Sequence, residues 1–442
     1  MTVSTRPGFR CSWRAIEWWG AALSLFLQTG AIFPLLMSEA DGALSDVAKS
    51  RLRLLTLPVY AYTIVMLVRH RHQFAIALRR NLHLLLLLAM PLVSILWSVA
   101  PSTSLRRAIG LIFTVLLAYV LAIRFSPRQL LLLVMLTSGV CVVASLLAIG
   151  VSPRLARMPT DGTLRGIFLH KNSLGWYASV TVITASIVLL DGEADYPRTT
   201  VALLLAGLAG LAGSTSMTAI LATTTAFFAI WVYSMLPRLG GLTRVAFVLL
   251  VLEFGTVLLV ALSAYLVPFL EAIGKDATLT GRVPLWALVD EQISQNLMTG
   301  FGYQAFWTEA NSRAWTIWSN IGWMAPHSHN GFREILLSFG LGGLAIFALV
   351  MLRAFRAGAA LHCGSPSEGW LWTNVVMVMV LVMNLTESML LVQNDGMFTV
   401  FMAAIIMCSL HTPAYRSNQA GLAGPQHPAQ RVRSEAPGQF IA

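Results

Sequence analysis

The stretch from Gln129 to Pro153 reads QLLLLVMLTSGVCVVASLLAIGVSP and contains no charged side chain. As an α-helix, a run of this length is long enough to cross the hydrocarbon core of a bilayer, which is about 30 Å thick. Comparable uncharged runs recur at 18–38, 84–104, 174–190, 335–352 and 369–386. This repeated pattern predicts an all-α protein, a polytopic bundle of transmembrane helices.

The composition agrees with a surface covered by lipid. Of 442 residues, 57% are hydrophobic and 11% are charged, whereas about 25% are charged in an ordinary soluble domain. The net charge of +11 raises the question of nucleic acid. The basic residues lie between the apolar runs rather than along one stripe, which is how topology is determined in membrane proteins. We therefore expect a lipid bilayer as a partner and no nucleic acid.

We expect about a dozen spans, each of roughly 15–25 residues. They are predicted near 18–37, 52–68, 83–100, 108–123, 130–150, 174–190, 199–213, 217–236, 245–268, 333–352, 369–387 and 396–411. With both termini in the cytoplasm, the short inside loops are rich in arginine, for example at Arg69, Arg71, Arg238 and Arg353, as the positive-inside rule requires. The chain then divides into helices 1–9 (1–268), an extracytoplasmic loop (269–332), helices 10–12 (333–411) and a cytoplasmic tail (412–442) that is poor in apolar residues and predicted to be disordered.

Several basic residues violate this topology rule. They are Arg154, Arg157, Arg165 and Lys171 in one outside loop, and Lys275, Arg282, Arg313 and Arg333 in or beside the 269–332 loop. One explanation is an anionic ligand, and the other is pairing with outside acids such as Asp161 and Asp290. For any single residue the second explanation is at least as good, but for the group we favour the ligand.

The run from Thr199 to Pro237 is uncharged, too long for one helix and short for two. Three glycines followed by Ser214-Thr215-Ser216 predict a break and a hairpin of two helices. Either the turn contributes Ser214 and Ser216 to a site at membrane depth, or the glycines simply let the helices pack closely.

In the 269–332 loop, Pro284 and the apolar spacing that follows it predict a short amphipathic helix along the membrane surface. Five of the 13 tryptophans also lie there, and most of them are expected to anchor the loop at the headgroup level. They are Trp286, Trp307, Trp315, Trp318 and Trp323.

Three polar clusters fall on the outside face: RGIFLHKNSLG at 165–175, LTGR at 279–282 and HSHNGFRE at 327–334. Taken alone, a histidine at a helix start is most often a cap or a surface residue, and an arginine such as Arg282 can be a cap or half of a surface ion pair. The four cysteines show neither paired spacing nor companion histidines, so we expect no disulfide framework, no metal site and no cofactor.

The order and spacing of these clusters resemble the bacterial O-antigen ligase/polymerase superfamily, especially the ExoQ-like exopolysaccharide polymerases. The matching elements are an Arg-Gly-x-Phe stretch ending in Lys-Asn-x-Leu-Gly, a Thr-Gly-Arg before a Trp-containing helix, Gly-Phe-Gly-Tyr at 300–303, a His-Asn-x-x-x-Glu stretch, and Glu387-Ser388. The Arg165–Phe168 element is one residue tighter than the spacing common among the ligases. The resemblance covers roughly 160–390, and the first 150 residues match only in hydropathy.

The resemblance implies a GT-C-like, metal-independent glycosyltransferase in the bacterial inner membrane, with its active site facing the periplasm. Such enzymes join oligosaccharide repeat units carried on undecaprenyl diphosphate into O-antigen or exopolysaccharide. A ligase that transfers the glycan to a lipid A-core or other acceptor is the nearest alternative, and a flippase or transporter is a weaker one. A chain-length regulator or other polysaccharide assembly proteins are the implied protein partners.

The same resemblance assigns roles to residues. Arg282 and Arg165 would clamp the diphosphate, since guanidinium groups stay charged and bind phosphate in a fork, with Lys171 as an added point charge. His329 would be the general base, with His327 as the alternative. Glu334 would orient the site by sharing a hydrogen bond with Asn330, one turn away. Besides Arg165 and Lys171, the predicted substrate-binding residues are Asn172, His327, Asn330, Ser214, Ser216 and Glu387.

Overall fold

The computed structural model describes residues 12–31, 46–192, 195–272 and 281–412. The predicted disordered tail lies outside the described residues apart from its first residue, as do Lys275 and the first two residues of the LTGR element, Leu279 and Thr280. In the described residues the protein forms helices and no β-strand, with a single β-bridge between Arg157 and Leu164. The prediction of an all-α bundle is therefore confirmed.

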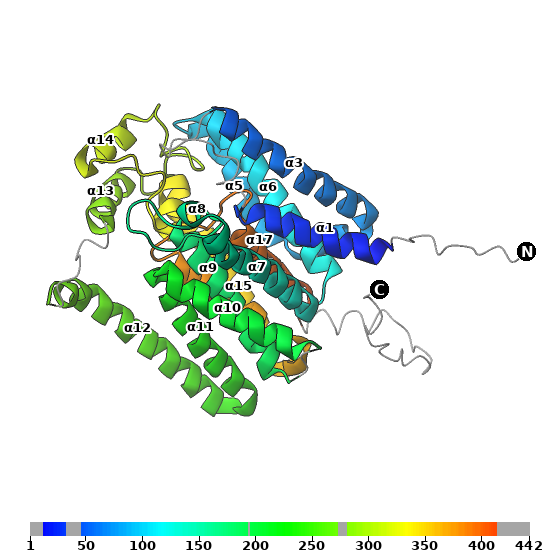
Figure 1. The fold of residues 1–442 in the computed structure, drawn as a ribbon. Helices are drawn as coiled ribbons and strands as arrows, with labels where there is room; N and C mark the ends of the chain where they lie inside the picture. The colour runs from blue at the N-terminus through cyan, green and yellow to red at the C-terminus, as the bar shows by residue number, and fades with distance from the viewer. Residues whose placement is uncertain (1–11, 32–45, 193–194, 273–280, 413–442) are drawn as a thin grey trace, which may run out of the picture.

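The α-helices run as follows, and Figure 1 labels all of them except α4 and α16. They are α1 (Trp13–Gln28), α3 (Asp46–Arg69), α4 (Arg71–Arg80), α5 (Leu82–Val93), α6 (Pro101–Arg124), α7 (Pro127–Val151), α8 (Pro153–Ala156), α9 (Lys171–Leu190), α10 (Pro197–Ser214), α11 (Met217–Met235), α12 (Gly241–Ala272), α13 (Arg282–Gln295), α14 (Ser312–Ile321), α15 (Gly331–Gly364), α16 (Trp370–Met383) and α17 (Gly396–Leu410). Short 3₁₀ turns occupy Ser94–Trp97, Leu236–Arg238 and Pro366–Glu368.

Six helices in the described part of the chain are long and apolar enough to cross a membrane: α6, α7, α9, α11 with the turn after it, the first part of α12, and α15. The pair α4 and α5, bent by 88°, would be a seventh. Each predicted span overlaps one helix, but α16 and α17 are among the shorter apolar helices. The protein is thus a multi-pass membrane protein, and a total of about twelve spans stays a prediction.

Local sequence explains where many of these helices begin. Proline stands at the start of α6, α7 and α10, where its missing N–H is not needed. Ser126 and Gln129 form a reciprocal capping box at α7, which satisfies two N–H groups that the helix leaves free. α17 is apolar on all sides and almost wholly buried, as expected for a helix at the centre of a bundle.

The predicted break after the glycine run is present between α10 and α11, where Thr215 has a left-handed φ of 49°. A Cβ added at Gly207 would lie 2.9 Å from the Val182 side chain of α9. The hydroxyl of Ser214 donates to the Leu211 carbonyl at 2.8 Å, and that of Ser216 accepts from the Ala219 N–H at 3.4 Å. The glycines therefore bring α10 close to α9, and the two serines cap the break.

α15 is broken near its start. Gly340 has φ 63° and ψ −157°, a backbone conformation essentially restricted to glycine. The loop segment 297–302 fills the break with backbone hydrogen bonds: Phe301 N–H to the Leu337 carbonyl (2.7 Å), Gly302 N–H to the Ser338 carbonyl (3.1 Å), and Leu341 N–H to the Leu297 carbonyl (2.8 Å). These contacts fasten the loop to a membrane helix.

The loop between α12 and α15 has a small core of its own. Its buried side chains include Leu285 and Val289 of α13, Ile317 and Trp318 of α14, and Trp307. Trp307 and Trp318 are buried, so the prediction of membrane anchoring is wrong for these two, whereas Trp315 and Trp323 are 48% and 40% exposed. The predicted helix after residue 281 is present as α13, and Figure 1 shows it beside α14 at one end of the molecule.

Candidate functional site

The site is built from segments that lie far apart in the sequence. The first turns of α9 and α13 contribute Asn172 and Arg282, the segment just before α15 contributes His329, and the loop between α16 and α17 contributes Glu387. The N-terminal end of a helix carries unpaired N–H groups and a partial positive charge. The arrangement therefore favours negative charge at this place.

Glu387 connects these segments and is only 3% exposed. Its Oε1 accepts a hydrogen bond from Arg282 Nη2 at 2.8 Å and another from Asn172 Nδ2 at 2.7 Å. Its Oε2 lies 3.7 Å from His329 Nδ1. Burial by itself raises the pKa of Glu387. The combined effect of His329 and the Arg282 guanidinium is opposite and larger, so the net shift of this pKa is downward. We call Glu387, Arg282, Asn172 and His329 the Glu387 cluster.

His329 adopts a left-handed φ of 52°, which is uncommon for a residue other than glycine and is often found at functional sites. Its Nδ1 is buried and has no hydrogen-bond partner among the described residues. Its ring lies 4.2 Å from the His327 ring and 5.9 Å from the Trp323 ring, measured between centroids. His329 is thus a partly exposed imidazole, with 21% of its side chain accessible, whose Nδ1 faces a buried carboxylate.

His327 differs in its protonation. Burial, helped by the nearby His329 and Arg282, lowers the pKa of His327 to about 3. Its Nδ1 accepts a hydrogen bond from the His329 N–H at 3.2 Å, so the neutral ring carries its proton on Nε2. A base this weak is poorly matched to proton abstraction near neutral pH.

His170 lies near the Glu387 cluster but was not among the predicted site residues. Its Nδ1 accepts from the Asn172 N–H at 3.1 Å and so caps α9. Burial lowers the pKa of His170, and the Glu387 charge opposes that shift. His170 directly precedes Lys171 and Asn172, which were both predicted to bind substrate. This neighbourhood is the feature of the sequence that could have identified it.

The predicted hydrogen bond between Asn330 and Glu334 is wrong. Asn330 caps α15 through its Oδ1, which accepts from the Phe332 and Arg333 N–H groups at 3.0 Å, and its Nδ2 donates to the Leu385 carbonyl at 2.9 Å. Glu334 Oε1 instead accepts from the Ser328 N–H (2.6 Å) and the Trp307 indole N–H (2.9 Å). Both polar groups of the Asn330 amide are therefore already hydrogen-bonded. Glu334 instead stabilises the turn that contains His327 and His329, through its hydrogen bond to the Ser328 N–H.

Arg165 and Lys171 have local partners. Arg165 donates to the Leu155 and Leu169 carbonyls at 3.0 and 3.4 Å. Lys171 pairs with Asp161 at 2.5 Å, and this hydrogen bond, with help from Thr163, lowers the pKa of Asp161 to about 2. Arg333 likewise pairs with Asp290 at 2.7 Å. The contacts of the described residues bring Arg282 into the Glu387 cluster but join neither Arg165 nor Lys171 to it.

The break at Ser214 and Ser216 lies close beneath the site. A Cβ added at Gly175, in the first turn of α9, would lie 2.7 Å from the Ser216 Cβ. The hydroxyls of Thr218 and Thr386 share a hydrogen bond of 2.7 Å, which ties α11 to the residue before Glu387. The two serines therefore pack next to the first turn of α9, and their hydroxyls form hydrogen bonds at the ends of α10 and α11.

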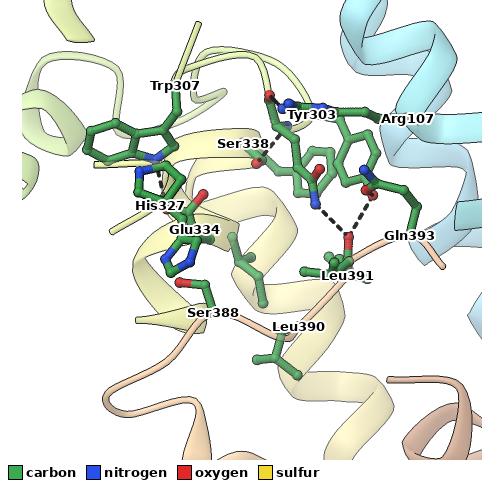
Figure 2. Close-up of a pocket in the computed structure, with 15 residues that line it drawn as sticks. Arg107, Tyr303, Trp307, His327, Glu334, Ser338, Ser388, Leu390, Leu391 and Gln393 are labelled. Atoms are coloured by element: carbon green, nitrogen blue, oxygen red, sulfur yellow. Dashed lines mark hydrogen bonds between the residues drawn. The ribbon is translucent and has the colours of Figure 1, made fainter. Parts of the chain in front are cut away.

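Beside the cluster lies a cavity of about 280 Å³, which we call the Arg107 pocket. Figure 2 shows His327, Glu334 and Trp307 on one side of it and Arg107 and Gln393 on the other. Its lining also includes Tyr303, Gln304, Pro326, Ile335, Ser338, Phe339, Ser388, Leu390, Leu391 and Val392. Arg107 and the two glutamines were not predicted to belong to the site. The predicted spans leave Arg106 and Arg107 in a short outside loop, although in the structure both lie in α6. Two basic residues at an outside position violate the topology rule, and this was a signal that the sequence offered.

Comparison with known proteins agrees with the motifs. Residues 201–348 match the model of a family described as O-antigen ligase, a range that contains Arg282, His329 and Glu334 but not Asn172 or Glu387. Over 272 residues the chain is 32% identical to the exopolysaccharide production protein ExoQ of Rhizobium meliloti (strain 1021). The alignment covers 60% of this chain and 62% of that relative, which is less than two thirds of the relative's length. The two matches confirm the predicted resemblance and support an O-antigen ligase/ExoQ-like family.

Proposed function

On the premise of an O-antigen ligase/ExoQ-like family, we propose that this protein is a glycosyltransferase of the bacterial inner membrane. It polymerises oligosaccharide repeat units carried on undecaprenyl diphosphate, in a site that faces the periplasm, with both termini in the cytoplasm and no bound metal. The observation that carries the proposal is the Glu387 cluster: a guanidinium and an imidazole beside one buried carboxylate, at the start of three helices.

Arg282 is the diphosphate clamp in this mechanism. Its Nη2 is engaged by Glu387, which fixes the direction of the guanidinium while its other N–H groups remain for phosphate oxygens. The N-terminal ends of α9, α13 and α15 add partial positive charge. Both effects stabilise the negative charge that develops on the departing diphosphate.

His329 is the general base. Its Nδ1 faces Glu387, so its Nε2 is the atom that takes the proton of the acceptor hydroxyl. As that proton leaves, the acceptor oxygen forms a bond to the anomeric carbon, and the bond from that carbon to the diphosphate oxygen breaks. The undecaprenyl diphosphate departs with the bonding electrons. The Glu387 carboxylate stabilises the resulting imidazolium, as a buried carboxylate does for a catalytic histidine.

Purified full-length protein in lipid nanodiscs, given the lipid-linked repeat unit and a chelator, tests this directly. We expect longer lipid-linked chains from the wild type and none from Arg282→Ala, His329→Ala or His329→Asn. The asparagine variant is the cleaner one because asparagine tolerates a left-handed backbone. Near-normal polymer from either position would remove that residue from the mechanism, and loss of activity only in the presence of chelator would contradict metal independence.

An O-antigen ligase is the second candidate, and the description of the family matched at 201–348 favours it. Deletion of the gene separates the two functions. A polymerase deletion accumulates short lipid-linked oligosaccharide, whereas a ligase deletion accumulates full-length lipid-linked polymer. A flippase would need two compartments, so turnover of lipid-linked substrate by protein in detergent argues against that function.

A further inference from the structure

We propose that the Arg107 pocket binds the sugar ring that carries the attacking hydroxyl, and that it is selective for an uncharged, hydroxyl-rich pyranose. The inference rests on the proposed function, because a polymerase must hold an acceptor sugar as well as a lipid diphosphate. It assigns the acceptor to a place that is separate from the clamp.

The pocket adjoins the Glu387 cluster at two points. His327 lines the pocket, and its ring centroid is 4.2 Å from that of His329. Ser388 lines the pocket as well and directly follows Glu387 in the chain. A ring held in the pocket therefore lies next to the proposed base without occupying the space around Arg282.

The charges of the lining suit a neutral ligand. The guanidinium of Arg107 and the carboxyl group of Glu334, whose pKa is raised by burial, lie on facing sides of the pocket (Figure 2). A diphosphate would meet the Glu334 carboxylate, whereas a sugar hydroxyl can accept from a guanidinium and donate to a carboxylate. Gln304 and Gln393 add amide groups of both kinds. At about 280 Å³ the pocket is at the lower limit of small-molecule sites, which span about 300–1,000 Å³, so it suits one ring rather than an oligosaccharide.

Some of these groups are already held in place by the protein. Arg107 Nη1 donates to the Gln304 carbonyl, Gln304 Nε2 donates to the Leu391 carbonyl at 3.1 Å, and the Tyr303 hydroxyl donates to the same carbonyl at 2.6 Å. Trp307 fixes Glu334 through its indole N–H. Figure 2 shows the dashed hydrogen bonds that converge on Leu391. These hydrogen bonds hold the pocket walls in fixed positions.

Ser388 supplies an independent sign of a missing partner. Its Oγ is buried and has no hydrogen-bond partner among the described residues. Buried hydroxyls are nearly always satisfied, because leaving one unpaired is unfavourable. A hydroxyl of a sugar ring in the pocket would satisfy it.

Two binding measurements on the full-length protein in nanodiscs test the proposal. One probe is the water-soluble oligosaccharide released by mild acid from the lipid-linked pool of the source strain, followed by saturation-transfer NMR. The other probe is undecaprenyl diphosphate, whose affinity is measured by competition with a labelled copy of the same lipid bound to the protein. Ser388→Ala should weaken oligosaccharide binding three- to tenfold, about the value of one hydrogen bond, and should not lower the thermal unfolding temperature, since the lost hydroxyl has no partner.

Val392→Trp fills the pocket and should abolish oligosaccharide binding while leaving lipid diphosphate binding within twofold of the wild type. Arg282→Ala should do the reverse, and Ser319→Ala, on the exposed side of α14, should change neither. Wild-type oligosaccharide affinity in both pocket variants overturns the inference. A wild-type protein that binds lipid diphosphate but no oligosaccharide also overturns it and leaves the proposed function standing, whereas a protein that binds neither contradicts the proposed function itself.

Discussion

Replacement of Glu387 by glutamine removes one negative charge from the site and almost nothing else. A glutamine Oε1 still accepts from Asn172, but the ion pair of 2.8 Å to Arg282 and the attraction toward His329 at 3.7 Å are lost. Both partners of the ion pair are largely buried, with side-chain exposures of 17% and 4%. Breaking a buried pair costs about 3–5 kcal/mol, and retaining the hydrogen bonds reduces this to roughly 1–3 kcal/mol.

The effect on turnover should be larger than the effect on stability suggests. A positioned general base contributes about 10²–10⁴-fold to a rate, and Glu387 acts through the orientation and charge of that base. We therefore expect kcat to fall roughly 10- to 100-fold, and the acid limb of the pH–rate profile to move to lower pH because the imidazolium loses its carboxylate. Glu387→Asp should restore the profile partly.

The assay is polymer formation in nanodiscs as a function of pH, with the thermal unfolding temperature measured on the same samples. Asp290→Asn is the matched control, since it neutralises an acid of α13 that pairs with Arg333 of α15 but is half exposed, so its cost should stay within about 1 kcal/mol. A Glu387→Gln enzyme with wild-type kcat and an unchanged pH profile would refute the positioning role, even if its stability had fallen.

Three further outcomes follow from the structure. The unfolded chain binds the His327 proton below about pH 6.5, whereas the folded protein binds it only below about 3. Acidification from pH 7 to 5 should therefore lower the unfolding temperature, with a shallower slope in His327→Gln; equal slopes would contradict the assignment. Gly340→Ala should destabilise by at least about 1–3 kcal/mol, because its Cβ would meet the Met298 backbone at 2.4 Å, while Gly342→Ala, with its nearest atom at 3.9 Å, should not; similar unfolding temperatures would refute the strain argument. Lys171→Gln should change turnover less than twofold if its role is the exposed pair with Asp161, and a large loss would return it to the site.

Much of the fold was predictable because lipid imposes a simple rule on sequence. The apolar runs marked helices, and the glycine–serine stretch marked the break between α10 and α11, since both signals are local. The hydrogen bond of Glu334 was not predictable, because its partner Trp307 is 27 positions away in the chain. Arg107 lies still further from Gln304 in sequence, and no local pattern connects an arginine in α6 with the loop.

For the Glu387 cluster, the identities of the residues were predictable but their contacts were not. Arg282, Asn172, His329 and Glu387 were each predicted from motifs, but not that one carboxylate would connect them. The break in α15 had no sequence signal either. FGLGG at 339–343 is compatible with an unbroken apolar helix, and only the insertion of 297–302 makes a left-handed Gly340 favourable.

That insertion uses main-chain groups almost alone. Amide and carbonyl groups are the same in every residue, so the junction places few demands on side-chain identity beyond its glycines. Residues on either side can therefore diverge between relatives while the loop keeps its register on α15. A chimaera that exchanges residues 308–325 and preserves 297–302 and 337–341 should therefore fold, and it should keep the sugar selectivity of its own Arg107 pocket, since no residue that lines the pocket lies in the exchanged stretch.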